Sequence, residues 1–514
     1  MIFGPAHQVY APQDRLRGMS ATPRPRDIVY REFAERLLSR AAGAPLVPGN
    51  AVELLIDGEA NFAAWLRAIR GATRRVLLEN YIVRDDAIGG EFRDALAERA
   101  SAGARVAVIV DWLGCLGQSG RRFWAPLRAA GGEVRVYNPP RLGDSFGWIS
   151  RDHRKLLVVD GVQGYLSGVC LSAKWLGNPA RGEPPWRDTG VALRGPAVAE
   201  LEHAFVQSWN SLGPPFGETL AQPQSIAAAG AVAVRVIATE PASAKLYRLD
   251  QLIAAMARRT LWLTDAYYVG IAPYVQALVG AAHDGVDVRL LVPGASDVPV
   301  VAAMSRSGYR PLLSAGIRIY EWNGSMLHAK TAVVDGLWSR VGSSNLNLSS
   351  WLGNRETDVA IEDTGFAALL AAQYESDLGN ATEIVLAPRR FRRGERVETS
   401  EAPGAGRPRA RRTGGSSRAA VGALRIATSV GVALHAHRVL GDTARAPVLT
   451  GSLLLAAFAA VAALWPRSVA WPIAAIAAWF ALNLAIRRSR EMLRRRRWRR
   501  LEAEESPRQP RDRR

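Results

Sequence analysis

Hydrophobic and polar positions along residues 28–386 follow two periods in turn, one helical and one extended. Apolar residues recur with helical spacing in four segments of the first half, residues 28–42, 60–70, 91–102 and 123–130. Between them lie short apolar runs typical of buried strands, residues 52–56, 75–82, 105–111 and 133–137. This alternation predicts an α/β fold in which helices cover mixed, mostly parallel sheets.

The same order of elements returns in the second half of the chain. The segment Gly103–Val110 resembles Gly285–Val292, and Glu133–Tyr137 resembles Gly316–Tyr320. The sequence therefore predicts two copies of one α/β domain, residues 28–212 and 231–386, related by pseudo-two-fold symmetry. An insertion at residues 138–151 of the first copy is rich in Pro, Gly and aromatic residues, which indicates a loop at the mouth of a site.

Outside these two copies the pattern changes. Residues 1–27 are polar and dotted with Pro and Arg, which predicts a flexible N-terminal arm. Residues 387–418 are rich in Arg, Gly and Pro and are typical of a linker. Residues 419–440 fit an amphipathic helix on a membrane surface, and residues 487–514 form an Arg-rich tail.

Two uncharged apolar runs lie near the C-terminal end, at residues 448–465 and 469–486. At about 1.5 Å per residue each would extend roughly 27 Å as a helix, slightly less than the ~30 Å hydrocarbon core of a bilayer. A buried helical hairpin of a soluble domain is the alternative. Arginines at one end and Trp465 and Trp471 at the other favour a two-helix membrane hairpin over residues 448–486, either spanning or embedded in one leaflet.

The charge of the chain is unevenly distributed. Residues 387–514 contain 27 Arg and 9 acidic residues, whereas residues 1–386 contain 39 basic and 38 acidic residues. The repeated region is therefore nearly neutral, which disfavours a nucleic-acid-binding groove despite the formal net charge of +19. Two cysteines, Cys115 and Cys170, make no disulfide framework and fit a reducing compartment.

The strongest motif occurs once in each copy. His153–Asp160 reads HRKLLVVD and His328–Asp335 reads HAKTAVVD, so corresponding residues are 175 positions apart. Because side chains alternate along a strand, the histidine and the lysine two positions later project from the same face. The chain has only four lysines, and two of them occupy this position, which argues against coincidence.

Two such pairs facing one another suit chemistry on a phosphodiester. Lys155, Lys330 and the amide of Asn345 can neutralise its oxygens. One neutral histidine can attack phosphorus while the other, protonated, donates to the leaving alkoxide. No metal or other cofactor is needed, and no cluster with metal-ligand spacing stands out in the sequence.

The duplicated motif, followed by Gly342–Asn345 in the second copy, resembles the phospholipase D superfamily. Asp152–Lys155, Trp186–Thr189 and Asn354–Glu356 are similar to stretches of bacterial cardiolipin synthases. This resemblance covers residues 28–386. It implies two phospholipase D-like α/β/α domains that share one active site.

The resemblance also implies individual roles. His153 would be the nucleophile and His328 the general acid, with Asp188 and Glu356 fixing the imidazole tautomers. The motif aspartates would organise the loop after each strand. The candidate residues for catalysis are His153, Lys155, Asp160, His328, Lys330 and Asp335, and those for binding and orienting the phosphate are Asn345, Ser343, Asp188 and Glu356.

One departure from the family pattern concerns Cys170. It stands where the first copy of a synthase usually has an asparagine, and a thiol is a weak substitute for an amide donor. A small buried residue is a better interpretation than a catalytic thiol. Glu79, Asp111 and Asp265 lie near predicted strand ends, where carboxylates either bind a polar headgroup or cap the sheet.

Together these features predict a phosphatidyltransferase that acts on anionic phospholipids at the cytoplasmic face of a bacterial inner membrane. It would transfer a phosphatidyl group from phosphatidylglycerol or another phospholipid to phosphatidylglycerol through a phosphohistidine. The alternatives are a lipid hydrolase of the phospholipase D type, a nuclease and a non-catalytic membrane protein. No nucleic-acid partner is expected, and nothing in the sequence indicates an oligomeric state.

Overall fold

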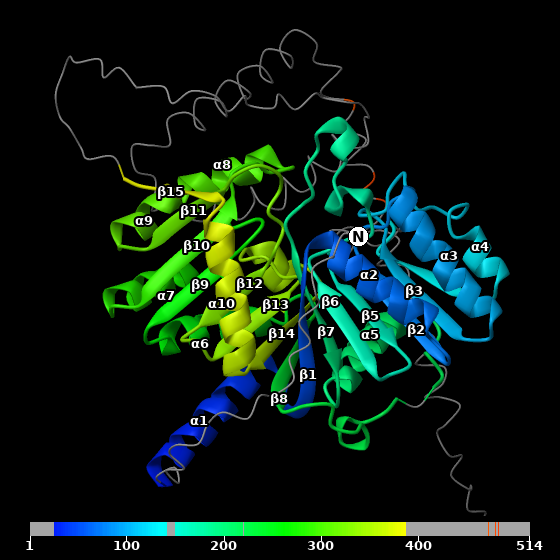
Figure 1. Cartoon of the computed structure of the whole chain (residues 1–514), viewed down its shortest axis with the longest axis horizontal. Coiled ribbons are helices and arrows are strands. Elements are labelled where there is room, and N and C mark those ends of the chain that lie inside the picture. The colour runs from blue at the N-terminus through cyan, green and yellow to red at the C-terminus, as the bar shows by residue number, and fades with distance from the viewer. Residues whose placement is uncertain are drawn as a thin grey trace, which may run out of the picture. The chain divides into compact units, whose positions relative to one another are not determined.

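The structure is a computed structural model that describes residues 25–140, 150–218, 220–386 and the single residues 471, 479 and 482 (Figure 1). Within these, residues 25–137 and 152–386 form one compact unit. The predicted linker, amphipathic helix, Arg-rich tail and most of the arm, the hairpin and the inserted loop lie outside the described residues. No described helix is both long and apolar enough to cross a membrane.

The first half alternates helices and strands up to the first motif and then forms three consecutive strands before its last helix. Its elements are α1 (Pro25–Ala42), β1 (Val47–Ile56), α2 (Asp57–Arg70), β2 (Arg75–Asn80), α3 (Ala87–Ser101), β3 (Arg105–Asp111), α4 (Ala125–Ala129), β4 (Glu133–Tyr137), β5 (Lys155–Val159), β6 (Gln163–Ser167), η2 (Ala173–Trp175), η3 (Pro179–Arg181), β7 (Thr189–Arg194) and α5 (Val198–Ser211). The predicted bounds of β3 and β4 agree with the structure. The helix predicted at residues 123–130 is shorter, since α4 has five residues.

The second half repeats this order with one additional strand. Its elements are η4 (Pro223–Ser225), β8 (Val232–Thr239), α6 (Lys245–Met256), β9 (Thr260–Thr264), α7 (Ala272–His283), β10 (Asp287–Pro293), α8 (Pro299–Ser307), α9 (Tyr309–Ser314), β11 (Arg318–Trp322), β12 (Thr331–Val334), β13 (Trp338–Gly342), the π-helix η5 (Ser349–Gly353), β14 (Glu356–Glu362), α10 (Thr364–Leu378) and β15 (Ala381–Ile384).

All described strands join one 15-stranded sheet in the order β15-β11-β10-β9-β12-β13-β14-β8-β1-β7-β6-β5-β2-β3-β4. The order is symmetric about the central pair, β8 and β1, apart from the additional β15 at one edge. The two halves are thus two copies of one unit fused through an antiparallel pairing of β1 with β8. The domain boundaries at residues 212 and 231 stay predictions.

The expectation of mostly parallel sheets is wrong. Among the described strands, parallel pairing is confined to β2–β3–β4 and β9–β10–β11, and the other neighbours are antiparallel. For the pairs β5–β6 and β12–β13, the reason lies in the turn after each motif strand. Asp160 and Gly161 have φ angles of 55° and 71°, and Asp335 and Gly336 have 54° and 68°. Such left-handed pairs make tight hairpins, so the chain returns antiparallel instead of crossing over through a helix.

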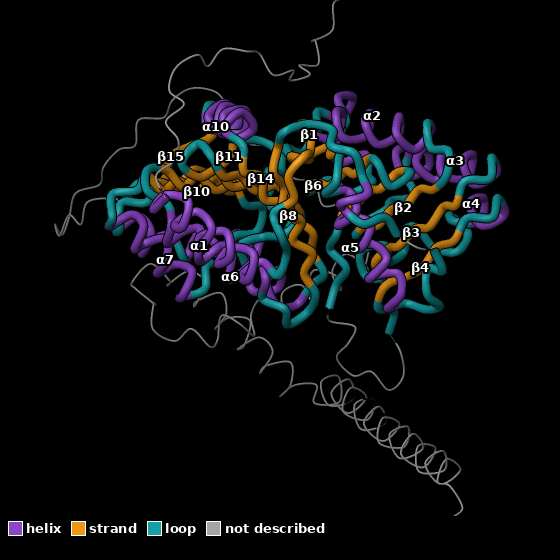
Figure 2. Tube along the Cα trace, turned by 90° about the horizontal axis from the view of Figure 1, so that it is seen from below, coloured by secondary structure: helices purple, strands orange, loops and turns teal. Residues whose placement is uncertain are grey.

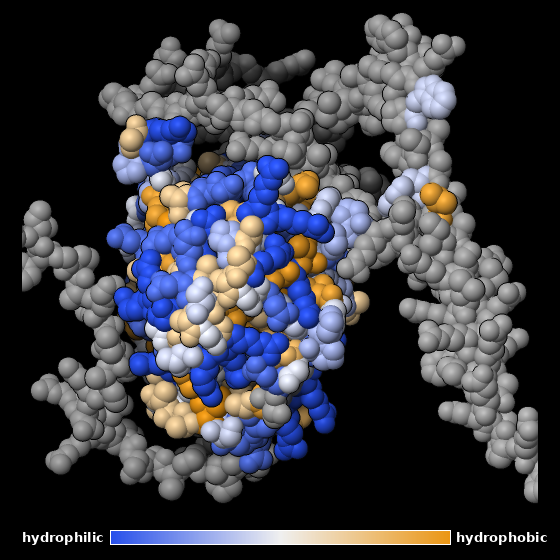
Figure 3. Space-filling view, turned by 90° about the vertical axis from the view of Figure 1, so that its right-hand side faces the viewer, coloured by the Kyte–Doolittle hydropathy of each residue, from blue (hydrophilic) through white to orange (hydrophobic). Residues whose placement is uncertain are grey.

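Helices cover both faces of the sheet (Figure 2), which explains the continuous apolar runs in the strands. In β2, Val76 and Leu78 pack in a core with α2 and α3, whereas Leu77 packs on the opposite face with α5. In the second half, α6 and α7 cover one face and α10 covers the other. A strand buried on both faces loses the alternation of polar and apolar residues. The outer surface over α3 and α4 is largely hydrophilic (Figure 3).

Candidate active site

The two motifs place their histidines and lysines at the beginning of the equivalent strands β5 and β12. All four side chains are buried, with His153 and His328 9% and 4% exposed. The Nζ of Lys155 donates to the carbonyl oxygen of His153 at 2.6 Å, and Lys330 makes the equivalent bond to His328. Lys330 Nζ also lies 3.1 Å from His328 Nδ1. Each ammonium is therefore fixed beside its imidazole.

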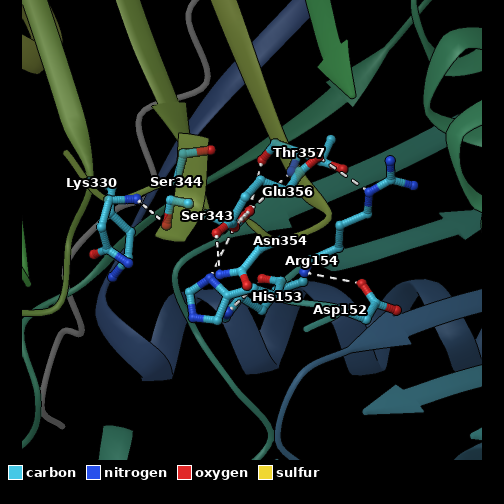
Figure 4. Close-up of polar contacts among 12 residues, drawn as sticks. Asp152, His153, Arg154, Lys330, Ser343, Ser344, Asn354, Glu356 and Thr357 are labelled. Atoms are coloured by element: carbon cyan, nitrogen blue, oxygen red, sulfur yellow. Dashed lines mark hydrogen bonds and ion pairs between the residues drawn. The ribbon is translucent and has the colours of Figure 1, made fainter. Parts of the chain in front are cut away.

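Each histidine receives its carboxylate from the other half of the chain. His153 Nδ1 lies 2.9 Å from Glu356 Oε2 at the start of β14 (Figure 4), and His328 Nδ1 lies 2.9 Å from Asp188 Oδ2 just before β7. The backbone follows the same exchange, because the N–H of His153 donates to Arg355 O at 2.9 Å. With Nδ1 held by a carboxylate, Nε2 is the ring nitrogen suited to attack or donate. The site is thus built across the two halves.

Burial and neighbouring charges set different proton affinities within the site. Burial lowers the pKa of His328 to about 4, and the nearby Lys330 acts in the same direction. Burial likewise lowers the pKa of Lys330 to about 8. Burial acts to raise the pKa of Asp188, but His328 and Lys330 hold it below its usual value. Burial raises the pKa of Glu356 to about 7, against the opposing charge of Lys155. These shifts favour a neutral His328 beside an ionised Asp188.

The two orienting carboxylates are held by different donors. Ser343 Oγ donates to Glu356 Oε2 at 2.6 Å, whereas Trp175 Nε1 donates to Asp188 Oδ2 at 2.8 Å. The residue equivalent to Ser343 in the first copy is Gly168, where an added Cβ would lie 2.2 Å from Asp188 Oδ1. Trp175 was not predicted from the sequence, where the one sign of a different donor is Gly168 in place of the serine of the second copy.

Two buried arginines also connect the halves and were not assigned from the sequence. Arg154 donates from Nε to Glu356 O at 3.2 Å and from Nη2 to Thr239 O at 3.0 Å. Arg187 binds both oxygens of Asp377 at 2.9 Å each. Each arginine neighbours a site residue in the sequence, so these bonds fix the segments that carry His153 and Asp188.

Asn345 and Cys170 occupy equivalent places in the two copies. Asn345 is 4% exposed, and its Oδ1 has no hydrogen-bond partner among the described residues. An unsatisfied buried acceptor is unfavourable, which suits Oδ1 to accept from a ligand hydroxyl, whereas contact with a phosphoryl oxygen uses the amide N–H groups. Cys170 is 1% exposed and burial raises the pKa of its thiol, so it is a neutral packing group.

The structure does not bring the motif aspartates to the site. Asp160 and Asp335 follow β5 and β12, at the strand ends opposite to the histidines. Asp335 Oδ1 accepts from the N–H groups of Arg259 and Thr260 at 2.7 and 3.0 Å, and Asp160 binds the start of β2 in the same way. The prediction that Asp160 and Asp335 belong to the catalytic group is therefore wrong. Each of them joins the hairpin turn after its motif strand to the neighbouring strand.

Three carboxylates near strand ends, those of Glu79, Asp111 and Asp265, either bind protein groups or are completely buried. Asp111 accepts from the N–H of Asp152 at 3.0 Å, and Asp265 accepts from the N–H of Leu346 at 2.8 Å. Glu79 is completely buried, 3.8 Å from a nitrogen of Arg154. These positions fit a capping and packing role better than contact with a headgroup.

Aromatic rings surround the His328 imidazole. The ring centroids of Trp175, Trp186 and Tyr267 lie 5.4, 5.7 and 5.7 Å from that of His328. Trp175 and Trp186 also contact each other at 4.8 Å. We call these three rings the aromatic box. The box could not be predicted from sequence pattern, because Tyr267 lies about 80 residues or more along the chain from the two tryptophans.

Comparison with known proteins agrees with this geometry. Residues 250–378 match the family model described as "Cardiolipin synthase, PLD-like domain". Cardiolipin synthase A of Pseudomonas aeruginosa is 34% identical over 364 residues, which cover 69% of this chain and 72% of that protein. The chain belongs to the cardiolipin synthase family.

A further relative supports this assignment, and one solved structure shares the fold. The cardiolipin synthase of Geobacillus kaustophilus is 34% identical over 359 residues, covering 68% of this chain and 70% of that protein. The phosphatidylserine synthase of Haemophilus influenzae matches in fold with a TM-score of 0.52 at 14% identity, covering 68% of this chain and 92% of that one. As a family member, the chain is an enzyme, a phosphatidyltransferase of the phospholipase D superfamily.

Proposed function

We propose that this enzyme makes cardiolipin by transferring a phosphatidyl group from phosphatidylglycerol, or from another phospholipid, to phosphatidylglycerol through a phosphohistidine. The observation that carries the proposal is the exchange of carboxylates between halves, which orients His153 and His328 at one shared site. Relatives named cardiolipin synthase support the substrate class.

In the first step His153 Nε2 attacks the phosphorus of the donor lipid. A P–N bond forms, the P–O bond to the departing glycerol breaks, and His328 gives its proton to the leaving oxygen. Lys155, Lys330 and Asn345 neutralise the phosphoryl oxygens. The low pKa of His328 favours its neutral form before substrate binds, and the charge of a bound phosphodiester offsets that of Lys330. Substrate binding therefore raises the pKa of His328 toward the range in which it acts as an acid.

In the second step the roles reverse. An acceptor hydroxyl gives its proton to His328 Nε2, its oxygen bonds to phosphorus, and the P–N bond to His153 breaks. Glu356 stabilises the imidazolium that His153 forms in the intermediate, since it accepts from Nδ1. If water takes the place of the acceptor alcohol, the product is phosphatidate, as in a phospholipase D.

Product analysis tests the proposal. With phosphatidylglycerol labelled in its headgroup and acyl chains, the expected products are cardiolipin and glycerol, whereas phosphatidate alone would establish hydrolysis instead. Acid-quenched enzyme should carry a phosphatidyl group on His153, detectable by mass spectrometry. In a cardiolipin-deficient bacterium, the chain should restore cardiolipin, while His328→Ala should not. His283→Ala, at the exposed end of α7, is the matched control and should behave as the parent.

We also propose that the enzyme works at the cytoplasmic face of a bacterial inner membrane, attached through residues 448–486. The absence of charge in the two apolar runs and the flanking arginines support this location. Introducing Leu455→Arg and Ile476→Arg together should release the chain from sedimenting membranes, because each charge at the centre of a bilayer costs about 2.5–3.5 kcal/mol or more. Unchanged sedimentation would contradict the proposed attachment.

A further inference from the structure

The aromatic box lies around the imidazole that the alcohols of the reaction must reach. In the proposed mechanism the departing alcohol takes a proton from His328 Nε2, and the acceptor returns one to the same nitrogen. Both alcohols therefore lie next to the His328 ring. The ring centroids of Trp175, Trp186 and Tyr267 lie 5.4–5.7 Å from that of His328, so these rings are its aromatic neighbours.

The members of the box differ in how firmly they are held. Trp175 is 2% exposed, and its Nε1 donates to Asp188 at 2.8 Å, so its ring is fixed with the catalytic pair. Trp186 and Tyr267 are only half-buried. They form the part of the box that a ligand can reach. Indole and phenol faces pack well against the C–H groups of glycerol and poorly satisfy the hydrogen bonds of water.

A cation lies at the outer side of this box. Lys174 is exposed, and its Nζ lies 4.9 Å from the centroid of the Trp186 ring. It is one of the four lysines of the chain, and two of the others belong to the motifs. Phosphatidylglycerol carries its own phosphate three carbons from the hydroxyl that attacks. An acceptor whose hydroxyl reaches His328 across Trp186 would thus bring a negative charge toward Lys174.

We propose that Trp186 and Lys174 form the acceptor subsite, which selects an anionic glycerophospholipid alcohol over water when the phosphohistidine breaks down. The inference rests on the proposed function. Trp186 packs against the acceptor's glycerol and excludes water from His328, and Lys174 binds the acceptor's phosphate. In the selected step the P–N bond breaks, the acceptor oxygen bonds to phosphorus, and its proton moves to His328 Nε2. Water reacts through the same bond changes, with its oxygen bonding to phosphorus, and yields phosphatidate.

The product ratio is the appropriate measurement, because both products come from one intermediate and the ratio is independent of the amount of folded enzyme. The full chain is assayed in vesicles containing labelled phosphatidylglycerol, and cardiolipin and phosphatidate are quantified together. Trp186→Ala should shift the ratio toward phosphatidate about tenfold, a difference of about 1.4 kcal/mol between the two pathways. Trp186→Phe should retain most of the parental ratio.

Variants that remove or keep the positive charge of Lys174 test whether it binds the acceptor's phosphate. Lys174→Gln should raise the KM for acceptor phosphatidylglycerol about fivefold, leave the rate of phosphatidate formation unchanged and weaken the dependence of transfer on salt. Lys174→Arg should restore transfer. Two controls lie outside the subsite: Trp322→Ala on β11 and Lys245→Gln at the start of α6 should leave the ratio unchanged.

The possible results separate the inference from the proposed function. If Trp186→Ala and Lys174→Gln lower both products equally, the two residues have only a structural role and the inference is wrong. If Trp186→Ala does not fold, the test rests on Trp186→Phe and Lys174→Gln. A parental KM for acceptor phosphatidylglycerol in Lys174→Gln would then overturn the proposal that Lys174 binds the acceptor's phosphate. If the parent enzyme produces phosphatidate and no cardiolipin, the proposed transfer itself fails.

Discussion

Replacing Asp188 by Asn should disable the histidine of the other half of the chain. Asp188 is completely buried and accepts from His328 Nδ1 at 2.9 Å and from Trp175 Nε1 at 2.8 Å. The amide keeps the shape but loses the charge that stabilises a protonated His328. A hydrogen bond between charged groups contributes about 1.5–3 kcal/mol, and with the lost ion pair we expect a total of about 3–4 kcal/mol in the step that needs the acid. This corresponds to a decrease in kcat of roughly 10²–10³-fold on phosphatidylglycerol.

The choice of leaving group distinguishes this loss from general damage. A phosphatidyl ester of p-nitrophenol releases a stable anion that needs no proton, so Asp188→Asn should still form the phosphohistidine from it. The breakdown of the phosphohistidine in this variant needs His328 as a base and should remain slow. We therefore expect a burst of about one p-nitrophenolate per active site, followed by slow turnover, with the phosphatidyl group trapped on His153.

Glu356→Gln is the matched variant on the nucleophile's side. Glu356 accepts from His153 Nδ1 at 2.9 Å. Replacing its carboxylate by an amide should therefore lower the rate at which the phosphohistidine forms, whether the leaving group is p-nitrophenolate or glycerol. His283→Ala serves as the control, and thermal unfolding checks that each variant is folded. A burst in Glu356→Gln together with none in Asp188→Asn would show that the roles of the two histidines are exchanged. Equal losses in every assay would refute the assignment of separate acid and nucleophile.

Three further predictions concern residues in and around the motifs. His328 must carry a proton in the first step and burial lowers its pKa to about 4, so kcat/KM should already fall about tenfold per pH unit above roughly pH 4. Because burial lowers the pKa of Lys330 to about 8, its ammonium is lost above that pH, and the fall should steepen to about a hundredfold per pH unit. A pH profile that does not steepen near pH 8 would contradict the role of Lys330. Asp335→Ala should lower the free energy of unfolding by about 2–3 kcal/mol in urea titrations while kcat per folded enzyme changes little, since Asp335 accepts backbone N–H groups from Arg258 to Thr260; the reverse result would place it in the chemistry. Iodoacetamide at neutral pH should leave activity intact, because burial raises the pKa of the Cys170 thiol, and rapid inactivation would show that this thiol is reactive.

Several features of the fold follow from local sequence pattern alone. The 175-residue offset between His153 and His328 predicted two equivalent units, and the strand order is symmetric about β1 and β8. The apolar runs at residues 105–111 and 133–137 predicted strands with the observed bounds. These predictions succeed because strand formation and side-chain direction depend on residues close in sequence.

The direction of strand pairing was decided by the turns. The apolar runs after each motif are equally compatible with parallel and antiparallel neighbours. The backbone of Asp160 and Asp335, with φ angles of 55° and 54°, turns the chain back on itself. Asp160 was identified as a residue that organises this loop, but the sequence did not indicate that the turn returns the chain as the antiparallel hairpins β5–β6 and β12–β13.

The sequence predicted a set of candidate site residues, but not which of them contact one another. The sequence indicated that Asp188 and Glu356 orient imidazoles. Only the tertiary structure assigned Glu356 to His153, 203 residues away, and brought Trp175, Trp186 and Tyr267 around His328. Periodicity specifies which face of a strand or helix is buried, whereas the partner of a side chain depends on how the two halves pack across the central β1–β8 pair.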